Sequence, residues 1–233
     1  MTFTSLASSS RGNAYVVSDG ETTLLLECGL SFRELQKRLG YGVADITACL
    51  VSHEHQDHAK AAAQMLKAGV PVYMSEGTAA AHKDAMDAAN LIKAGDVLRF
   101  GHLTVVPFRT FHNTDEPLGF LIEDGRTKER LLWAVDTANL GVTADRLTYI
   151  AVECNYEESL LNRSDRIPSV LKERIRHSHF EVNDVIKWLH KQDLSGVLTI
   201  WLLHLSAGNS RAEAWQRRFE REFPGITIRI CEE

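Results

Sequence analysis

The chain has 233 residues, of which 44% are hydrophobic and 24% are charged, and these proportions exclude a collagen-like, coiled-coil or disordered protein. No apolar run approaches the roughly 18 residues that a membrane-spanning helix needs, and the N-terminus lacks the basic start and apolar stretch of a secretory signal. The net charge of −5 argues against unspecific adhesion to nucleic acid or anionic membranes. We therefore expect a cytoplasmic protein that binds no membrane, with its four scattered cysteines reduced.

Short strand-like runs alternate with helical stretches along the chain. The expected strands cover residues 2–6, 14–19, 22–27, 46–52, 70–74, 98–108, 118–123, 130–135, 149–154, 197–203 and 226–230. The expected helices cover residues 32–39, 59–68, 168–176, 183–191 and a C-terminal stretch that ends at 222. The run 46–52 is almost unbroken in its apolar character, which is typical of a strand buried on both faces. This order predicts an α/β (α+β) fold in a single domain over residues 1–233, with two sheets packed face to face and helices outside.

A cluster of histidines follows this apolar run, in the string Ser52-His53-Glu54-His55-Gln56-Asp57-His58. Residues two apart in an extended loop point the same way, so His53 and His55 can face one cation. Asp57 and His58 lie where the loop enters the next expected helix, which turns them toward a second position. The metalloprotease pattern H-E-x-x-H is absent, because Asp57 stands where its second histidine would be. A solvated polar loop could explain one such histidine, but three beside an aspartate predict ligands for two metal ions.

The pattern H-x-H-x-D-H after a buried strand resembles the signature of the metallo-β-lactamase superfamily, whose fold is a four-layer αββα sandwich. The resemblance implies three further ligands, each just past an expected strand, namely His112, Asp136 and His204. It also implies how seven ligands are shared between two cations. One cation would be held by His53, His55 and His112 and the other by Asp57, His58 and His204, with Asp136 between them.

A narrower likeness covers nearly the whole chain and points to the YycJ/WalJ-type branch of exonucleases. The matching strings are Ser8-Ser9-Ser10-Arg11-Gly12-Asn13, His112-Asn113-Thr114-Asp115-Glu116-Pro117-Leu118-Gly119-Phe120, Glu153-Cys154-Asn155-Tyr156, Ser178-His179-Phe180-Glu181-Val182-Asn183, and His204-Leu205-Ser206 with Asn209. Two positions depart from the usual pattern. Glu27 stands where aspartate is common, and Ser178 stands before His179 where glycine is more usual.

Imidazole and carboxylate ligands without thiolate suit two divalent metal ions, zinc by default and manganese next, and the sequence does not choose between them. Paired cations lower the pKa of a bridging water toward about 7, so a metal-bridging hydroxide would serve as nucleophile at neutral pH and Asp57 would orient it. The leaving oxygen needs a proton, and His179 is the candidate general acid or phosphate contact. A histidine that packs near a helix start is the alternative for His179. His82, His102, His177 and His190 are expected at the surface or in packing.

Two loops are candidates for substrate binding, because small polar residues let backbone N–H groups approach phosphate oxygens. They would contribute Ser9, Ser10 and Asn13 from one loop and Ser206 and Asn209 from the other. Residues 163–176 hold five basic and two acidic side chains, a local excess that would follow a nucleic-acid backbone or simply be a solvated helix face. Tyr156 and Phe180 are candidate aromatics for stacking on bases.

The leading hypothesis is a dinuclear metal-dependent phosphodiester hydrolase, and most specifically a DNA exonuclease. The alternative is a hydrolase of small esters, lactones or cyclic phosphodiesters on the same fold. A scaffold that only binds a partner is a third hypothesis, but such proteins usually lose ligands and all seven are present here. The sequence leaves open the metal, DNA against RNA, the polarity of digestion and the oligomeric state.

Overall fold

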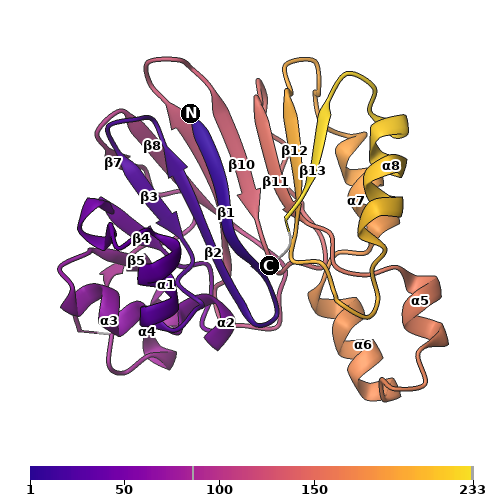
Figure 1. Ribbon diagram of the computed structural model, residues 1–233, viewed down its shortest axis with the longest axis horizontal. Helices are drawn as coiled ribbons and strands as arrows, with labels where there is room; N and C mark the ends of the chain where they lie inside the picture. The colour runs from indigo at the N-terminus through magenta and orange to yellow at the C-terminus, as the bar shows by residue number, and fades with distance from the viewer. Residues whose placement is uncertain (86, 232–233) are drawn as a thin grey trace. The chain divides into compact units, whose positions relative to one another are not determined.

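The computed structural model describes residues 1–85 and 87–231. The chain separates into two compact units, which are described one at a time (Figure 1). The first unit comprises Met1–Arg109 and Thr114–Glu129, and the second comprises Thr110–Asn113 and the residues from Arg130 onward. The α/β class is confirmed within each unit, while a single domain over 1–233 stays a prediction.

The first unit contains one mixed sheet and one antiparallel ladder. The sheet has the order β1 (Thr2–Ser9), β2 (Gly12–Ser18), β3 (Thr23–Leu26), β4 (Ala48–Leu50), β5 (Val72–Met74) and β6 (Asn90–Leu91). Pairing is antiparallel from β1 to β3 and parallel from β3 to β6. The ladder consists of β7 (Leu98–Phe100), β8 (Leu103–Arg109) and β9 (Leu118–Asp124). The helices are α1 (Phe32–Arg38), α2 (Gln56–Ala59), α3 (Ala62–Lys67) and α4 (Glu76–Ala81), with a 3-10 turn at Val43–Asp45.

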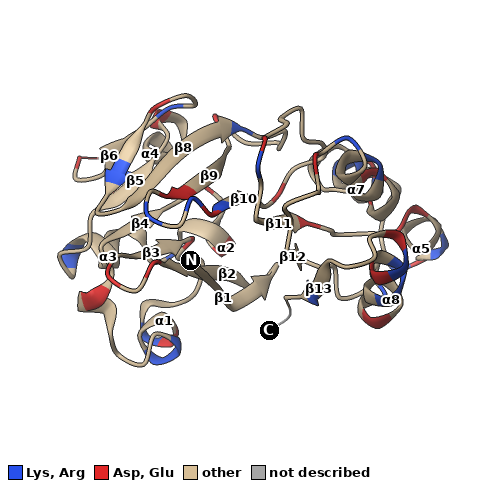
Figure 2. Cartoon of the chain, turned by 90° about the horizontal axis from the view of Figure 1, so that it is seen from above, with Lys and Arg blue, Asp and Glu red and all other residues tan. Residues whose placement is uncertain are grey.

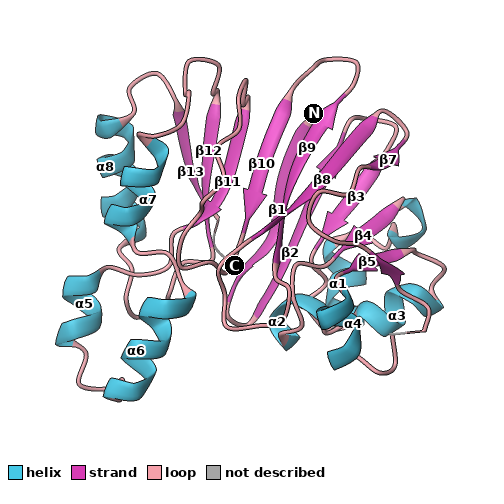
Figure 3. Cartoon of the chain, turned by 180° about the vertical axis from the view of Figure 1, so that it is seen from behind, coloured by secondary structure: helices cyan, strands magenta, loops and turns pink. Residues whose placement is uncertain are grey.

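Both faces of β4 are covered, as the apolar run 46–52 predicted, and the neighbouring β3 is buried in the same way. Leu25 and Cys49 point into a core that Leu35 of α1 and Met65 of α3 complete. Leu50 and its neighbours on the opposite face are also fully buried. Figure 3 shows α1, α3 and α4 gathered beside β4 and β5. A strand packed on both faces holds the loop that follows it in a fixed position.

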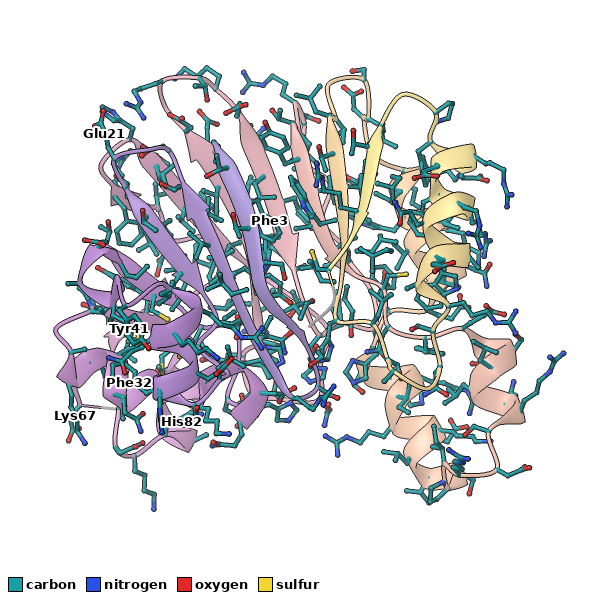
Figure 4. The ribbon with its side chains drawn as sticks, in the orientation of Figure 1. Phe3, Glu21, Phe32, Tyr41, Lys67 and His82 are labelled. Carbon is teal, nitrogen blue, oxygen red and sulfur yellow. The ribbon has the colours of Figure 1, made fainter. Side chains whose placement is uncertain are left out.

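The edge of this sheet is more open. Phe3 of β1 stacks on Tyr15 of β2 with ring centroids 5.8 Å apart, and Tyr41, beyond α1, is 77% exposed (Figure 4). The expected polar loop at Ser8–Asn13 is in fact a hairpin, since Ser8 and Ser9 belong to β1 and Asn13 to β2.

The second unit is built on a parallel sheet of β10 (Arg130–Ala134), β11 (Tyr149–Glu153), β12 (Thr199–Leu203) and β13 (Thr227–Ile230). Its helices are α5 (Glu158–Arg163), α6 (Ser169–Ser178), α7 (Val182–Leu189) and α8 (Ala212–Glu222). Helices α7 and α8 stand beside β12 and β13 (Figure 1), and α8 contributes the buried Trp215 and Phe219. Parallel strands carry their carboxyl ends to one edge, so residues after β10, β11 and β12 are brought together.

Several expected elements differ from those observed. The helix expected at 59–68 is broken into α2 and α3, because the Ala61 N–H donates to the Cys28 carbonyl at 2.9 Å instead of continuing the helix. The strand expected at 98–108 is two strands that turn at Gly101, whose φ is 56°. Helices α4 and α5 were not expected from the sequence. All four cysteines are buried, and no described helix has the length and apolar character to span a membrane.

Candidate metal centre

The first ligand group lies on the loop after β4, inside the first unit. His53 Nε2 and His55 Nδ1 are 3.1 Å apart, and the rings of His53 and His58 have centroids 4.1 Å apart. Asp57 Oδ2 lies 3.5 Å from His58 Nε2. The four side chains thus converge, as their spacing predicted, with His53 and His58 buried and Asp57 and His55 partly exposed.

Glu27 and Ser52 hold this group from behind. Glu27 follows β3, and its Oε2 lies 3.1 Å from His58 Nδ1 while its Oε1 accepts the Ser52 N–H at 2.9 Å. The Ser52 hydroxyl is 2.8 Å from His53 Nδ1. Burial raises the pKa of Glu27, against the opposing effect of His58. Glu27 thus supports the candidate ligand loop by hydrogen bonds, although its side chain is longer than that of the usual aspartate.

Two residues of the first unit directly contact the backbone of this loop. Asn13 is fully buried, and its Nδ2 lies 3.2 Å from both the Asp57 carbonyl and His58 Nε2. Gly29 approaches so closely that a Cβ there would lie 1.7 Å from the Asp57 carbonyl oxygen. Asn13 therefore positions a ligand loop in the structure, while its role in binding substrate stays a prediction.

Replacing Gly29 with alanine is expected to displace the ligand loop, because its new methyl group meets backbone atoms that cannot rotate away. We expect about 3 kcal/mol of lost stability and about a 100-fold loss of hydrolysis from misplaced ligands. Thermal unfolding and a steady-state hydrolysis assay check both effects. Gly141→Ala is the matched control, because its Cβ would meet nothing closer than 3.7 Å. Equal behaviour of the two variants would contradict this account of the loop.

The second ligand group is assembled inside the second unit at the carboxyl ends of its parallel strands. One ligand atom from each member lies within 4.8 Å of every other, and the members are Asp136, Glu153, His179 and His204. Asp136 Oδ1 lies 2.6 Å from His204 Nδ1, and Asp136 Oδ2 lies 3.6 Å from His112 Nε2. Asp136 thus stands between His112 and His204, which were both expected as ligands.

The backbone is strained at three residues that belong to the candidate metal centre or hold its ligands. Glu27, Asp136 and His204 have φ values of 66°, 44° and 52°, in the left-handed region that residues with a Cβ rarely adopt. Each such residue costs about 1–3 kcal/mol and persists only where its surroundings impose it. All three follow directly or closely on buried parallel strands, whose pairing holds the backbone in place.

Glu153, the last residue of β11, is the functional residue that sequence reasoning missed. Its Oε1 lies 2.7 Å from His179 Nδ1 and 3.2 Å from His204 Nδ1. Its Oε2 accepts the N–H groups of Thr137 at 2.7 Å and Phe180 at 3.2 Å. The available signal was a carboxylate that ends a wholly apolar strand, where a buried charge needs partners.

The electrostatics of the second group favour positive charge. Burial by itself lowers the pKa of His204, but the Asp136 and Glu153 carboxylates outweigh it and raise that pKa to about 10. Burial likewise lowers the pKa of His179, and Glu153 more than reverses the effect. Burial raises the pKa of Glu153 less than His179 and His204 lower it. Burial lowers the pKa of His112, which Asp136 only partly offsets.

These donor sets fit divalent cations. A metal-binding histidine usually has its other ring nitrogen held by a carboxylate, carbonyl or hydroxyl group. His53 is held in this way by Ser52, His58 by Glu27 and His112 by the Ser178 carbonyl, at 2.8, 3.1 and 2.7 Å. Because one ring nitrogen of each of these imidazoles is held in this way, the other ring nitrogen faces the neighbouring candidate ligands. Imidazole and carboxylate donors suit zinc, manganese and iron.

The remaining candidates lie as follows. Ser9 and Ser10 are at the β1–β2 turn, and Ser206 and Asn209 are on the loop after His204. Tyr156 and Phe180 are 4% and 1% exposed, so the expectation that they stack on bases is wrong, and they serve packing instead. His82, labelled in Figure 4, is buried with its Nε2 2.8 Å from the Glu54 carbonyl, and so packs under the first ligand loop.

Comparisons with known proteins agree with this geometry. The model of the β-lactamase superfamily domain matches residues 22–200. Exodeoxyribonuclease YycJ of Bacillus anthracis is 30% identical, over 91% of this chain and 84% of its own length. Exodeoxyribonuclease WalJ of Streptococcus pneumoniae is 25% identical, over 89% and 82%. The solved structure of YhfI, a metallo-β-lactamase fold protein from Bacillus subtilis, has a TM-score of 0.72 at 17% identity, covering 99% of this chain and 96% of its own.

The chain therefore belongs to the β-lactamase superfamily and is a hydrolase with the metallo-β-lactamase fold. The predicted fold class, the αββα sandwich of that superfamily, is confirmed. Within the superfamily the chain belongs to the YycJ/WalJ-like branch, whose named relatives are exodeoxyribonucleases.

Proposed function

We propose that this protein is a dinuclear metal-dependent phosphodiester hydrolase that acts on DNA as an exonuclease. The observation that supports the proposal is the presence of two clusters of histidine and carboxylate side chains. In both clusters, contacts with neighbouring residues hold one ring nitrogen of the histidines in place. The 30% identity to an exodeoxyribonuclease over 91% of the chain supports DNA as substrate.

The proposed ligand assignment follows the superfamily. The first cation would be held by His53, His55 and His112 and the second by Asp57, His58 and His204, with Asp136 shared by both. When bound, a pair of divalent cations supplies a water of lowered pKa and neutralises charge on the phosphodiester. Zinc and manganese are the proposed metals.

The protein's own contribution to the chemistry centres on His179 and Glu153. Glu153 holds His179 Nδ1 at 2.7 Å and favours the protonated imidazole. His179 is partly exposed, with 20% of its side-chain surface accessible. We assign it the delivery of a proton, from Nε2, to the oxygen that leaves the cleaved phosphodiester. The carboxylate of Asp57 would orient the attacking water.

The experiment that tests the proposal is digestion of 5′-labelled and 3′-labelled single-stranded and double-stranded DNA by the metal-loaded protein. We expect stepwise release of nucleotides from one end, loss of activity with EDTA and recovery with Zn²⁺ or Mn²⁺. An uncharged lactone and a cyclic phosphodiester are tested beside the DNA. Turnover of either one without any cleavage of DNA would overturn the exonuclease proposal.

A further inference from the structure

The second unit contains a cavity beside the helix pair α5 and α6. It has a volume of about 500 Å³ and is lined on one side by α5 and the α5–α6 connection, including Arg163, Asp165 and Arg166. Gly208 and Asn209, from the loop that follows His204, line the other side. Figures 1 and 3 show α5 and α6 side by side with this connection at their end. The volume is in the range of small-ligand sites.

Two basic residues of the 163–176 segment, Lys172 and Arg176, are held by neighbouring groups, whereas, in the part of the chain that the structure describes, the arginines of this cavity and Arg174 are not. Arg176 is engaged by Glu158 at 2.8 Å, and Lys172 Nζ donates to the Asn162 carbonyl at 3.0 Å. Among the residues that the structure describes, no ion pair or side-chain hydrogen bond involves Arg163 or Arg166. Figure 2 shows both acidic and basic residues on α5 and α8. The two arginines are therefore available to an anion.

Asn209 provides an independent sign of a ligand. It is 4% exposed, its Nδ2 donates to Ser206 Oγ at 3.1 Å, and its backbone carbonyl accepts the Glu157 N–H at 2.9 Å. Its Oδ1 is buried and, within the described chain, has no hydrogen-bond partner. A buried acceptor left unsatisfied costs about 1–3 kcal/mol, so a donor on a ligand would relieve it.

We propose that this cavity binds one nucleotide of the DNA strand. A phosphate of the strand would be held by the guanidinium groups of Arg163 and Arg166, which match phosphate oxygens in shape and charge. A base amino group of the same nucleotide would donate to Asn209 Oδ1. The inference rests on the proposed function, since it assigns part of the same substrate. It also gives a role to the loop after His204, which Asn155 fixes by donating to the His204 carbonyl at 2.8 Å.

The test compares Arg163→Gln/Arg166→Gln with Arg174→Gln/Lys191→Gln, which removes the same charge from exposed positions outside the cavity. We expect the cavity variant to raise KM for a single-stranded oligonucleotide about tenfold, as the loss of charged hydrogen bonds predicts. The slope of log KM against log salt should fall by about 0.7, for the one phosphate that the two arginines would hold together. Turnover of bis(p-nitrophenyl) phosphate, which contains no nucleotide, should be the same in the cavity variant and in the wild type. Arg163→Lys/Arg166→Lys should recover part of the KM and most of the salt slope.

The possible outcomes are distinct. If the wild-type protein cleaves bis(p-nitrophenyl) phosphate but both charge variants shift KM and salt slope equally, the cavity is overturned and the proposed function stands. If the metal-loaded wild type cleaves no phosphodiester, the proposed function itself fails. Deoxyadenosine monophosphate as a competitor separates a nucleotide from a simple anion. It should inhibit more strongly than inorganic phosphate, and this difference should disappear in Asn209→Leu, which removes the acceptor oxygen. Equal inhibition in the wild type would overturn the role of Asn209.

Discussion

Asp136→Ala is expected to reduce DNA hydrolysis by about 1,000-fold or more, since it removes the proposed shared ligand of both cations. In the structure this carboxylate is 3% exposed and stands between His112 and His204, at 3.6 and 2.6 Å. Its loss removes one of two carboxylates that favour a positive charge on the buried His204, and Glu153 remains at 3.2 Å. Steady-state hydrolysis of a labelled oligonucleotide measures the effect, and metal analysis of the same sample should show reduced occupancy.

Asp124→Ala is the matched control for this variant. Asp124 is also buried at the end of a strand, where it accepts the Arg126 N–H at 2.9 Å, but it belongs to neither ligand group. We expect a modest loss of stability with hydrolysis retained. Comparable activity in Asp136→Ala and the wild type would remove Asp136 from the metal centre.

The second large effect is expected from Glu153→Gln, which keeps the shape of the side chain and removes its charge. Glu153 is completely buried and contacts His179, His204 and two backbone N–H groups. Breaking such a buried pair costs about 3 kcal/mol of stability, and the loss of a partner behind a ligand typically costs about 10-fold to 100-fold in activity. Since Glu153 raises the pKa of His179, the decline of kcat on the alkaline side of the kcat–pH profile should begin at a lower pH in Glu153→Gln.

Two comparisons distinguish a positioning role of Glu153 from a purely structural role. Glu181→Gln removes another buried carboxylate of the second unit, one that caps α7 by accepting the Asn183 and Asp184 N–H groups. It should lower stability without changing the pH profile. His179→Ala should lower kcat while metal content is kept. Loss of metal in His179→Ala would instead make His179 a ligand.

Much of the site could be predicted from local sequence, because its first group comes from one short loop. The apolar run before Ser52 predicted a strand buried on both faces, and the alternation of His53 and His55 predicted two imidazoles on one side. Asp57 and His58 were expected to point toward a second position because the loop enters a helix there, and their side chains lie 3.5 Å apart.

The second group depends on contacts that no local pattern contains. Glu153 reads as the polar end of an apolar strand, and its importance follows only from the parallel register that sets Glu153 beside Leu203, just before His204. The break between α2 and α3 arises from the Cys28 carbonyl, thirty-three residues away from Ala61 in the chain. Tyr156 and Phe180 were misjudged because an aromatic residue beside a loop is compatible with either stacking or packing, and burial decides between them.

The most direct test of the account is the metal content of the purified wild-type protein, measured by elemental analysis after reconstitution with Zn²⁺ or Mn²⁺ and removal of excess ions. The seven proposed ligands predict close to two transition-metal ions per chain. Asp136→Ala, prepared in parallel, should hold clearly fewer. A wild-type protein that retains no metal ion, yet still hydrolyses DNA in the presence of EDTA, would contradict the dinuclear mechanism.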